Sequence, residues 1–265
     1  FAAGGDSAKE AFDQTIQALA DMDDPLAQSQ AGVALFGTMW EDLGPEVVTQ
    51  LANIEDGAYA TSDSMEELKD KYVLMHNLED YKGHWQERFP GKRLCLEIGC
   101  GKGRFLTGMA ELHPEKAFIG VETQHDISYY PGKYIMDNKL ENAVVICANA
   151  EQLEDWFEPG EIKELYLNFS DPWPKARHAK RRLTHRNLLA KYQRLLGSGG
   201  HLRFKTDNRA LFDFSVEEFK EFGLEIIALS YDLHHSEYEN EVQTEYEQKF
   251  SALGTPINFC EVVFK

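Results

Sequence analysis

The sequence predicts a doubly wound α/β fold, with a mostly parallel sheet of seven strands and an acidic α-helical extension at its N-terminal end. Short apolar runs alternate with helix-length stretches from about residue 72 onward, the pattern of parallel strands joined by crossover helices. A glycine-rich turn follows the first of these runs, and folds of this kind bind ligands at the carboxyl ends of their strands. The first 65 or so residues show only helical spacing.

The N-terminal extension, residues 1–64, is expected to form three helices: Ala8–Met22, a second from Pro25 to Phe36, and a short third one ending at Leu51. We expect residues 65–76 to be a linker and residues 77–265 to form the second domain. Within the extension, "DPLAQSQAGVALFGTMWEDLG" (Asp24–Gly44) resembles a segment of phage tail tape-measure proteins. An arbitrary acidic helical appendage is the alternative, and neither interpretation gives the extension a catalytic role.

Buried strands are expected where apolar runs are short and unbroken. In order, they are Leu94–Ile98, Ala117–Val121, Ala143–Cys147, Glu164–Phe169, Leu202–Phe204, Leu224–Leu233 and Ile257–Phe264. The helices expected between them are Gly103–Leu112, a stretch within Ile127–Leu140, Glu151–Phe157, His185–Leu196 and Ala210–Phe222. Helices between successive strands fit a sheet that is covered on both faces.

A strand-to-helix turn within Leu94–Phe105 ("LCLEIGCGKGRF") carries the first candidate site. Gly99, Gly101 and Gly103 let the backbone pass close to a ligand. Their spacing is GxGxG, and the next residue is Arg104, so the GxGxxG fingerprint of dinucleotide-binding proteins fails at its third glycine. The turn therefore indicates a cofactor other than a nicotinamide dinucleotide.

Two acids accompany this turn. Glu97 lies two residues before the first glycine, where a pyrophosphate would gain nothing from a carboxylate. A cationic group, such as the amino group of a methionine moiety, suits this position instead. Glu122 ends the second predicted strand, where an acid can accept both hydroxyl groups of a ribose. The two acids together indicate a cofactor that carries both a ribose and an amino group.

The fourth predicted strand leads into "LYLNFSDPWPKARHAKRRLTHRNLL" (Leu165–Leu189). Asp171 follows the strand directly, at the switch point where a side chain can meet both cofactor and substrate. Pro172 and Pro174 stiffen the turn around Trp173. Six basic residues then fall within eight positions, with no acid among them: Lys175, Arg177, His178, Lys180, Arg181 and Arg182. A solvated charge run is the alternative, but the position next to the rigid turn favours phosphate binding.

The net charge of −18 at first argues against a nucleic-acid partner, because phosphate binding needs lysine and arginine. The charge is unevenly distributed, however. Residues 1–75 hold 15 acidic and three basic side chains, whereas residues 171–209 hold 11 basic and two acidic ones. A protein that is acidic overall can still steer a polyanion to one basic loop.

Four segments match, in order and spacing, the bacterial tRNA (guanine-N7-)-methyltransferase family: "EIGCGKGRF", "LNFSDPWPKARHAKRRL", "FKTDN" (Phe204–Asn208) and "TEYEQKF" (Thr244–Phe250). The resemblance covers about residues 77–265. It implies a Rossmann-like class I methyltransferase fold and S-adenosylmethionine as the cofactor. It also implies a cytoplasmic enzyme whose partner is tRNA and whose reaction methylates N7 of a guanosine in the variable loop.

The resemblance also assigns residues to the site. The cofactor contacts would come from Glu97, Glu122, Asn149 and Asp171, with Gly99, Gly101 and Gly103 in the turn. The substrate contacts would come from Lys175, Asp207, Thr244, Glu245, Tyr246 and Glu247, and the RNA contacts from Arg177, His178, Lys180, Arg181 and Arg182. Asp171 is the expected catalytic residue, because a carboxylate there can accept hydrogen bonds from guanine and offset charge developing on the ring. Asp207 and Glu247 would assist it.

Two positions depart from the family pattern. Asn149 replaces an acid that would pair with the adenine amino group. Its amide oxygen can still accept a hydrogen bond, but it can equally cap the helix expected from Glu151, and the two roles compete for one side chain. Pro131-Gly132 is expected to interrupt a helix that is normally unbroken and so to shift one wall of the cofactor pocket.

Alternatives remain at this point. A methyltransferase acting on another RNA, a small molecule or a protein would share the cofactor turn but would have less use for the basic stretch, and a non-catalytic RNA-binding module would not need both Glu97 and Glu122. We expect no metal site, because the histidines and the four cysteines lack metal-ligand spacing. We expect no membrane association, because no apolar run approaches ~18 residues. A monomer and a homodimer are both compatible with the sequence.

Overall fold

The computed structural model describes residues 31, 62–238 and 240–265. The chain divides into two compact units, Phe1–Thr61 and Ser62–Lys265. The three helices expected in the N-terminal extension, and the segment that resembles tape-measure proteins, lie outside the described residues except for Ala31, which is helical.

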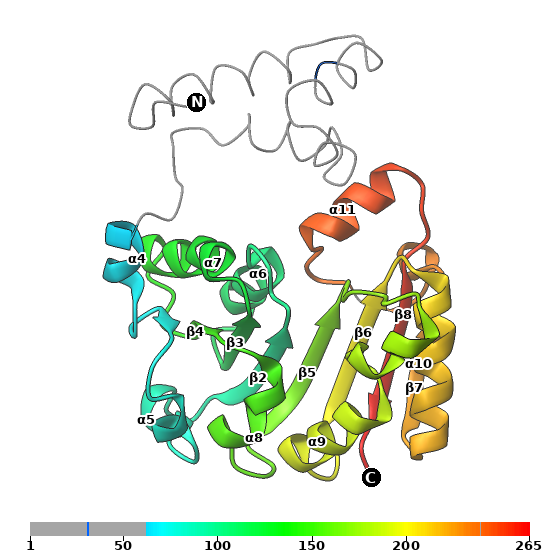
Figure 1. The fold of residues 1–265 in the computed structure, drawn as a ribbon, viewed down its shortest axis with the longest axis horizontal. Coiled ribbons are helices and arrows are strands. Elements are labelled where there is room, and N and C mark those ends of the chain that lie inside the picture. Colours follow the sequence, from blue (N-terminus) through cyan, green and yellow to red (C-terminus); the bar gives the residue numbers. More distant parts are fainter. Residues whose placement is uncertain (1–30, 32–61, 239) are drawn as a thin grey trace. The chain divides into compact units, whose positions relative to one another are not determined.

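The second unit is built on one eight-stranded sheet with the order β1-β4-β3-β2-β5-β6-β8-β7 (Figure 1). The strands are β1 (Val73–Leu74), β2 (Arg93–Ile98), β3 (Lys116–Glu122), β4 (Ala143–Cys147), β5 (Ile162–Asn168), β6 (His201–Thr206), β7 (Glu225–Ser230) and β8 (Asn258–Val263). All neighbouring pairs are parallel except those of β8, which runs antiparallel to both β6 and β7. The expected doubly wound, mostly parallel sheet is therefore confirmed.

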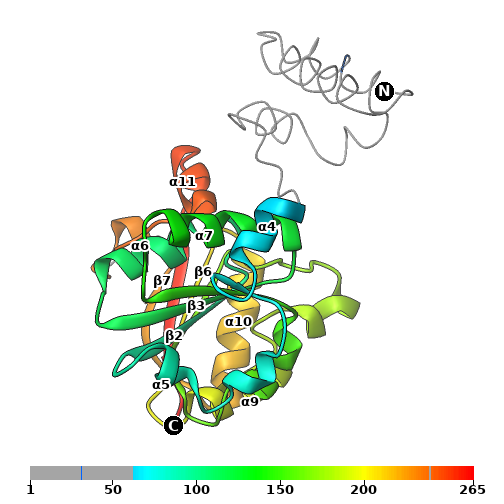
Figure 2. The ribbon, with the colours of Figure 1, turned by 90° about the vertical axis from the view of Figure 1, so that its left-hand side faces the viewer.

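Helices cover the sheet on both faces (Figure 2). The longer ones are α6 (Arg104–Leu112), α7 (His125–Asp137), α9 (Arg186–Leu196), α10 (Arg209–Phe222) and α11 (Glu245–Ala252), and the short ones are α4 (Ser62–Leu68), α5 (Trp85–Arg88) and α8 (Leu153–Trp156). The apolar runs that predict the strands form the core, and side chains such as Leu96, Val144 and Leu167 are almost completely buried. Burial on both faces explains why these strands read as continuous apolar runs.

The sheet has eight strands rather than the expected seven. The additional strand, β1, contains only Val73 and Leu74 and pairs with β4 at the sheet edge. Two residues are too few to show an alternating pattern, so the sequence contains no signal for this strand. Residues 65–76, expected to be a linker, contain β1 and most of α4, and Met65 and Leu68 are buried in the fold of the second unit.

The prediction that Pro131-Gly132 interrupts a helix is wrong. Helix α7 runs without a break from His125 to Asp137, with Pro131 in its interior. Proline removes one N–H from the helix ladder, which weakens but does not end a helix that is held by packing. Both residues are buried, and a Cβ on Gly132 would come within 2.3 Å of Val73 Cγ2. The Pro-Gly pair therefore lets α7 pack closely against β1.

Candidate active site

The expected site residues gather at one edge of the sheet. Strand β2 is central, with β3 on one side and β5 on the other, so the chain reverses direction across the sheet at this point. The carboxyl ends of β2, β3, β5 and β6 carry Glu97, Glu122, Asn168 and Lys205. The arrowheads of β5 and β6 point toward α11 (Figure 1). A topological switch point is where open α/β sheets bind their ligands.

The glycine turn has the geometry that its sequence predicts. Gly99, Gly101 and Gly103 all have positive φ, at 78°, 55° and 82°, which other residues adopt only with strain. A Cβ on Gly99 or Gly101 would meet nothing within 4 Å, so open space lies next to this backbone. A Cβ on Gly103 would come within 2.3 Å of Pro131 Cβ, so this glycine is needed for close packing against α7.

Glu122 is buried and braces the turn. Its Oε2 accepts a hydrogen bond from the Gly101 N–H at 3.0 Å. Its Oε1 accepts from the N–H groups of Thr123 and Gln124, at 2.8 and 3.0 Å. The carboxylate therefore fixes the glycine turn relative to β3, in addition to the ribose-binding role expected for it.

Glu97 is a buried carboxylate with one oxygen free. The residue is only 3% exposed, and its Oε1 accepts a hydrogen bond from Asn168 Nδ2 at 2.8 Å. Its Oε2 is buried and has no partner among the described residues. Burial raises the pKa of Glu97 to about 8, although the hydrogen bond from Asn168 and the charge of Lys205 act in the opposite direction. A cationic ligand group would complete this site.

Asn149 adopts the capping role. Its Oδ1 accepts a hydrogen bond from the Glu151 N–H at 2.9 Å and caps the 3-10 turn Ala150–Gln152. The amide nitrogen has no partner in the described part of the chain and is the group left for a ligand.

Asp171 is exposed, and no described residue pairs with its carboxylate. It lies within a strained turn, between the non-glycine residues Phe169 and Trp173, which have φ values of 52° and 41°. Strain of this kind costs of order 1–3 kcal/mol per residue and persists only where the surroundings impose it. The Phe169 N–H donates to the Lys205 carbonyl at 2.9 Å, so the turn is anchored to the end of β6.

The basic loop forms a 3-10 helix, η3 (Ala176–Arg181). Lys175, Arg177, Lys180 and Arg181 are exposed, His178 is half-buried, and none of them pairs with an acid among the described residues. The loop is organised around Trp173: the Arg181 guanidinium lies 4.9 Å from its ring centroid and the His178 ring meets it edge-on at 5.8 Å. This basic surface is available to a polyanion.

Arg182 differs from its neighbours. Its Nε and Nη2 donate to the carbonyl oxygens of Pro172 and Trp173, at 3.1 and 3.0 Å, and its guanidinium lies 4.3 Å from the Phe214 ring centroid. These contacts hold the strained turn in place. Arg182 is thus a half-buried residue that stabilises the loop, whereas Arg181 is exposed on the loop surface.

The remaining expected substrate residues lie at the ends of β6 and on α11. Asp207 is half-buried, and this burial raises its pKa. Thr244 caps α11, since its Oγ1 accepts from the Glu247 N–H at 3.0 Å. Glu245 is exposed, and Tyr246 is 60% exposed with its ring stacked on Phe169 at a centroid distance of 6.4 Å. The structure thus brings α11 beside the Asp171 turn.

Glu247 is fully buried and is bonded to residues that the sequence analysis did not select. Lys205, His234 and Asn240 all contact its carboxylate, and Asn168 contacts Glu97 on the neighbouring strand. Lys205 and Asn168 are polar residues at the ends of buried apolar runs, "LRFKT" and "LYLNF", and this pattern is the signal that could have identified them. His234 and Asn240 lie in an irregular segment whose sequence carries no comparable signal.

No group of three or more histidine, cysteine, aspartate or glutamate side chains with metal-binding geometry occurs in the described residues. All four cysteines are free thiols, and burial raises the pKa of Cys260 to about 12. Within residues 62–238 and 240–265, no helix has the length and apolar character needed to cross a membrane.

Comparison with known proteins agrees with this geometry. A family model described as "Putative methyltransferase" matches residues 91–260. The chain is 45% identical over 194 residues to the tRNA (guanine-N(7)-)-methyltransferase of Bacillus subtilis (strain 168), a match that covers 73% of this chain and 91% of that protein. It is 48% identical over 187 residues to the protein of the same name from Limosilactobacillus reuteri (strain DSM 20016), covering 70% of this chain and 88% of that protein.

Solved structures with low sequence identity share the fold. The 16S rRNA methyltransferase KamB superimposes with a TM-score of 0.53 at 12% identity, covering 68% of this chain and 92% of that one. The antibiotic-resistance methyltransferase Kmr superimposes with a TM-score of 0.50 at 19% identity, covering 69% and 92%. These matches confirm the expected class I methyltransferase architecture. Given the identity to proteins matched over nearly their whole length, the chain belongs to the tRNA (guanine-N7-)-methyltransferase family.

Proposed function

We propose that this protein transfers a methyl group from S-adenosylmethionine to N7 of a guanosine in the variable loop of tRNA, with Asp171 as the catalytic residue. The observation that carries the proposal is the position of the Asp171 carboxylate. It is exposed and unpaired among the described residues, on a strained turn between the carboxyl edge of the sheet and the basic loop. One carboxylate can therefore face both a cofactor on the sheet edge and a polyanion on the loop.

The residues present fit S-adenosylmethionine. The free, buried Oε2 of Glu97 is suited to the amino group of its methionine moiety, and the space beside Gly99 and Gly101 admits a ligand close to the backbone. Glu122, which already holds the glycine turn, would bind the ribose, and the Asn149 amide nitrogen would be the group left for the adenine. When bound, S-adenosylmethionine supplies a methyl group activated by the adjoining sulfonium.

Guanine N7 carries a lone pair in the plane of its ring, so it can accept a methyl group without prior loss of a proton. The protein therefore needs no general base and no metal for this step. Its task is to hold the guanine in line with the methyl group and to exclude water, which is catalysis by proximity. Asp171 would accept hydrogen bonds from guanine and offset the positive charge that develops on the ring.

The remaining contacts divide into guanosine recognition and RNA binding. Asp207, Lys175 and the first turn of α11 would contact the guanosine, with the Glu247 carboxylate itself buried and bonded to Lys205, His234 and Asn240. The exposed cations of the basic loop would bind the tRNA backbone, with Arg182 supporting the turn. We infer a cytoplasmic enzyme that acts as a monomer or a homodimer.

Incubation with tritiated S-adenosylmethionine and unmodified tRNA, followed by nucleoside analysis, tests the proposal. We expect 7-methylguanosine as the product. The Asp171→Ala variant should lose about 100-fold or more in rate while keeping its melting temperature, because an exposed loop carboxylate contributes little to the core. Asp213→Ala, which removes an exposed carboxylate from α10, is the matched control. Methylation of another nucleoside, or wild-type turnover by Asp171→Ala, would refute the assignment, and activity on ribosomal RNA alone would favour the alternative substrate class.

A further inference from the structure

We propose that Lys205 is a positioning residue for guanosine methylation, in that its buried ammonium group fixes the Glu247 carboxylate and the first turn of α11 at the end of β6. The inference rests on the function proposed above, which places the guanosine beside that turn. It assigns a role to a buried charge that the mechanism described so far does not use.

Lys205 lies where the two halves of the site meet. It is the second-to-last residue of strand β6, directly before Thr206, and its side chain is 7% exposed. Across the sheet it is paired with Asn168, which in turn holds Glu97. Lys205 and Glu97 are close enough for the charge of each to affect the pKa of the other, so the ammonium interacts with the acid assigned to the cofactor as well as with the acid on α11.

The ammonium has three N–H donors, and each has an acceptor. Nζ donates to Glu247 Oε2 at 2.7 Å, to Asn240 Oδ1 at 3.1 Å and to the Val242 carbonyl at 3.3 Å. The acceptors belong to α11 and to the segment that precedes it. Three bonds of different direction fix the position of these elements more tightly than the charge alone would, because a hydrogen bond weakens steeply when its angle changes.

Glu247 depends on this partner. It is 0% exposed, and its second oxygen, Oε1, accepts from His234 Nε2 at 2.7 Å and from Asn240 Nδ2. Burial acts to raise the pKa of Glu247, but the charge and hydrogen bond of Lys205, together with the hydrogen bonds from His234 and Asn240, hold it below its usual range. A buried carboxylate without its counter-charge is strongly destabilised, so loss of Lys205 would displace or protonate Glu247.

A displacement of Glu247 would be transmitted to the Asp171 turn by a few direct contacts. The Glu247 N–H is the group that Thr244 caps, so the carboxylate and the start of α11 move together. Tyr246, between them, is stacked on Phe169, whose own N–H is bonded to the Lys205 carbonyl. Two residues later in the chain lies Asp171. A displacement of about 1 Å at a reacting centre can cost about 10²-fold in rate.

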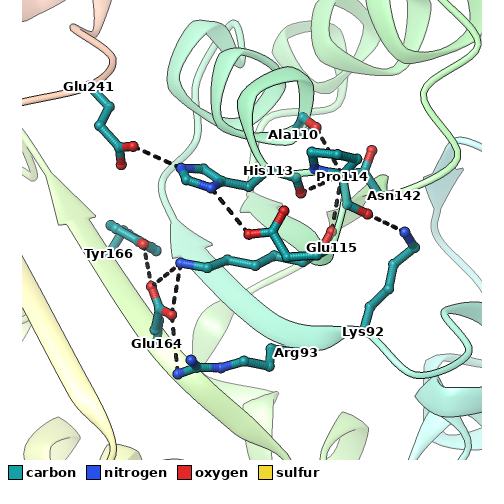
Figure 3. Close-up of polar contacts among 11 residues, drawn as sticks. Lys92, Arg93, Ala110, His113, Pro114, Glu115, Asn142, Glu164, Tyr166 and Glu241 are labelled. Atoms are coloured by element: carbon teal, nitrogen blue, oxygen red, sulfur yellow. Dashed lines mark hydrogen bonds and ion pairs between the residues drawn. The ribbon is translucent and has the colours of Figure 1, made fainter.

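The same sheet face offers a matched control. Lys116 on β3 is also mostly buried and pairs with Glu164 at 3.0 Å, but this pair lies toward the other end of the strands. Figure 3 shows Glu164 with its further partners Arg93 and Tyr166. Replacing Lys116 removes a lysine that pairs with a largely buried carboxylate outside the proposed site, and Glu164 keeps Arg93 and Tyr166 as partners.

The test compares Lys205→Met with Lys116→Met by steady-state kinetics on unmodified tRNA at saturating S-adenosylmethionine. Rates are counted per cofactor-binding molecule, from the stoichiometry of a calorimetric titration, so a smaller folded fraction does not count as lost activity. We expect Lys205→Met to lose about 10²-fold in kcat while KM for tRNA stays within about threefold, because the basic loop is unchanged. Lys116→Met should keep the wild-type kcat.

Equal kcat values per binding molecule for Lys205→Met and the wild type, or equal losses for both variants, would overturn the proposal. If Lys205→Met does not fold, Lys205→Gln replaces it. Glutamine keeps a hydrogen-bond donor but lacks the charge, so we still expect kcat to fall, whereas Lys116→Gln should keep the wild-type value. Failure of both Lys205 variants to fold would show that the ion pair is purely structural. Absence of 7-methylguanosine with the wild type would refute the proposed function itself, an outcome distinct from each of these.

Discussion

Glu97 and Asp171 illustrate two ways in which single carboxylates become functional. Asp171 is exposed on a strained turn, whereas Glu97 is buried with one oxygen unpaired among the described residues. Both residues could be selected from the sequence, because each lies at or just after the end of a predicted strand. The hydrogen-bond partner of Glu97 does not follow from the sequence, because Asn168 reaches Glu97 only through the pairing of β5 with β2.

Cofactor binding should release a proton from Glu97. Its pKa of about 8 means that the carboxyl is protonated in the free protein at neutral pH, whereas the amino group of S-adenosylmethionine favours the carboxylate. Affinity should therefore rise between pH 6 and 8, by up to about tenfold per unit. Calorimetry in buffers of different ionisation enthalpy counts the released proton. Glu97→Gln should bind weakly at every pH without proton release, and an uptake or absence of protons with the wild type would contradict the assignment.

The same group predicts how the stability of the cofactor-free protein depends on pH. Because the pKa of Glu97 in the folded protein lies above its ordinary value of 4.5, the folded state holds a proton that the unfolded state releases. Its contribution is fully present below about pH 4.5 and is lost as pH rises toward 8. Urea unfolding should thus show Glu97→Gln gaining stability relative to the wild type from pH 5 to 8. A constant difference across this range would count against the buried, protonated state.

Replacing Arg181 and Arg182 one at a time should distinguish a residue that binds RNA from one that supports the loop. Arg181→Ala removes one exposed cation and should lower the slope of log K for tRNA against log salt by about one. Arg182→Ala removes the bonds to Pro172 and Trp173 and should mainly lower kcat, because the Asp171 turn loosens. Filter binding over a salt series and steady-state rates measure both effects. Arg186→Ala, whose guanidinium is already paired with Glu218, is the control, and an unchanged slope for Arg181→Ala would mark a solvated surface.

At the scale of elements, strands β2 to β8 and the long helices other than α11 could be predicted from the sequence to within a few residues. The reason for the strands is that their apolar runs are short, unbroken and bounded by glycine or polar residues, as in Ala143–Cys147. Short elements such as β1 and η3 could not be predicted, because they are held by contacts distant in sequence. The Pro131-Gly132 error has the same origin: local propensity opposes a helix there, and packing against β1 and the glycine turn overrides it.

Gly132→Ala tests that explanation. In an isolated helix the change would stabilise by about 1 kcal/mol. Here the new Cβ would lie 2.3 Å from Val73 Cγ2, so we expect a net loss of about 1–3 kcal/mol in the free energy of unfolding. Combining it with Val73→Ala should recover part of that loss, since the clash is removed. Urea unfolding of both variants is the measurement, and a gain in stability from Gly132→Ala alone would show that α7 and β1 are not in close contact.

At the scale of the whole molecule, charge is segregated along the chain. Residues 1–61 hold 11 acidic side chains and a single lysine, Lys9, whereas residues 171–209 hold 11 basic and two acidic ones. The sites proposed for cofactor and tRNA all fall in the second unit, Ser62–Lys265. Their positions in the sequence allow the catalytic apparatus to be assigned to this unit alone, while the overall charge opposes the approach of a polyanion.

Deleting residues 1–61 should leave S-adenosylmethionine affinity unchanged and strengthen tRNA binding, most visibly at low salt. The truncation removes a net charge of −10, and the repulsion it exerts on an approaching polyanion is screened beyond about 10 Å at 0.1 M salt. The cut at Ser62 keeps α4, whose Met65 and Leu68 belong to the core. Filter binding at several salt concentrations measures the gain, with a melt of both proteins as the control for folding. If the extension instead contributes to the stability of the catalytic unit, the truncated protein will melt at a lower temperature and lose methylation, and the charge argument will then be wrong.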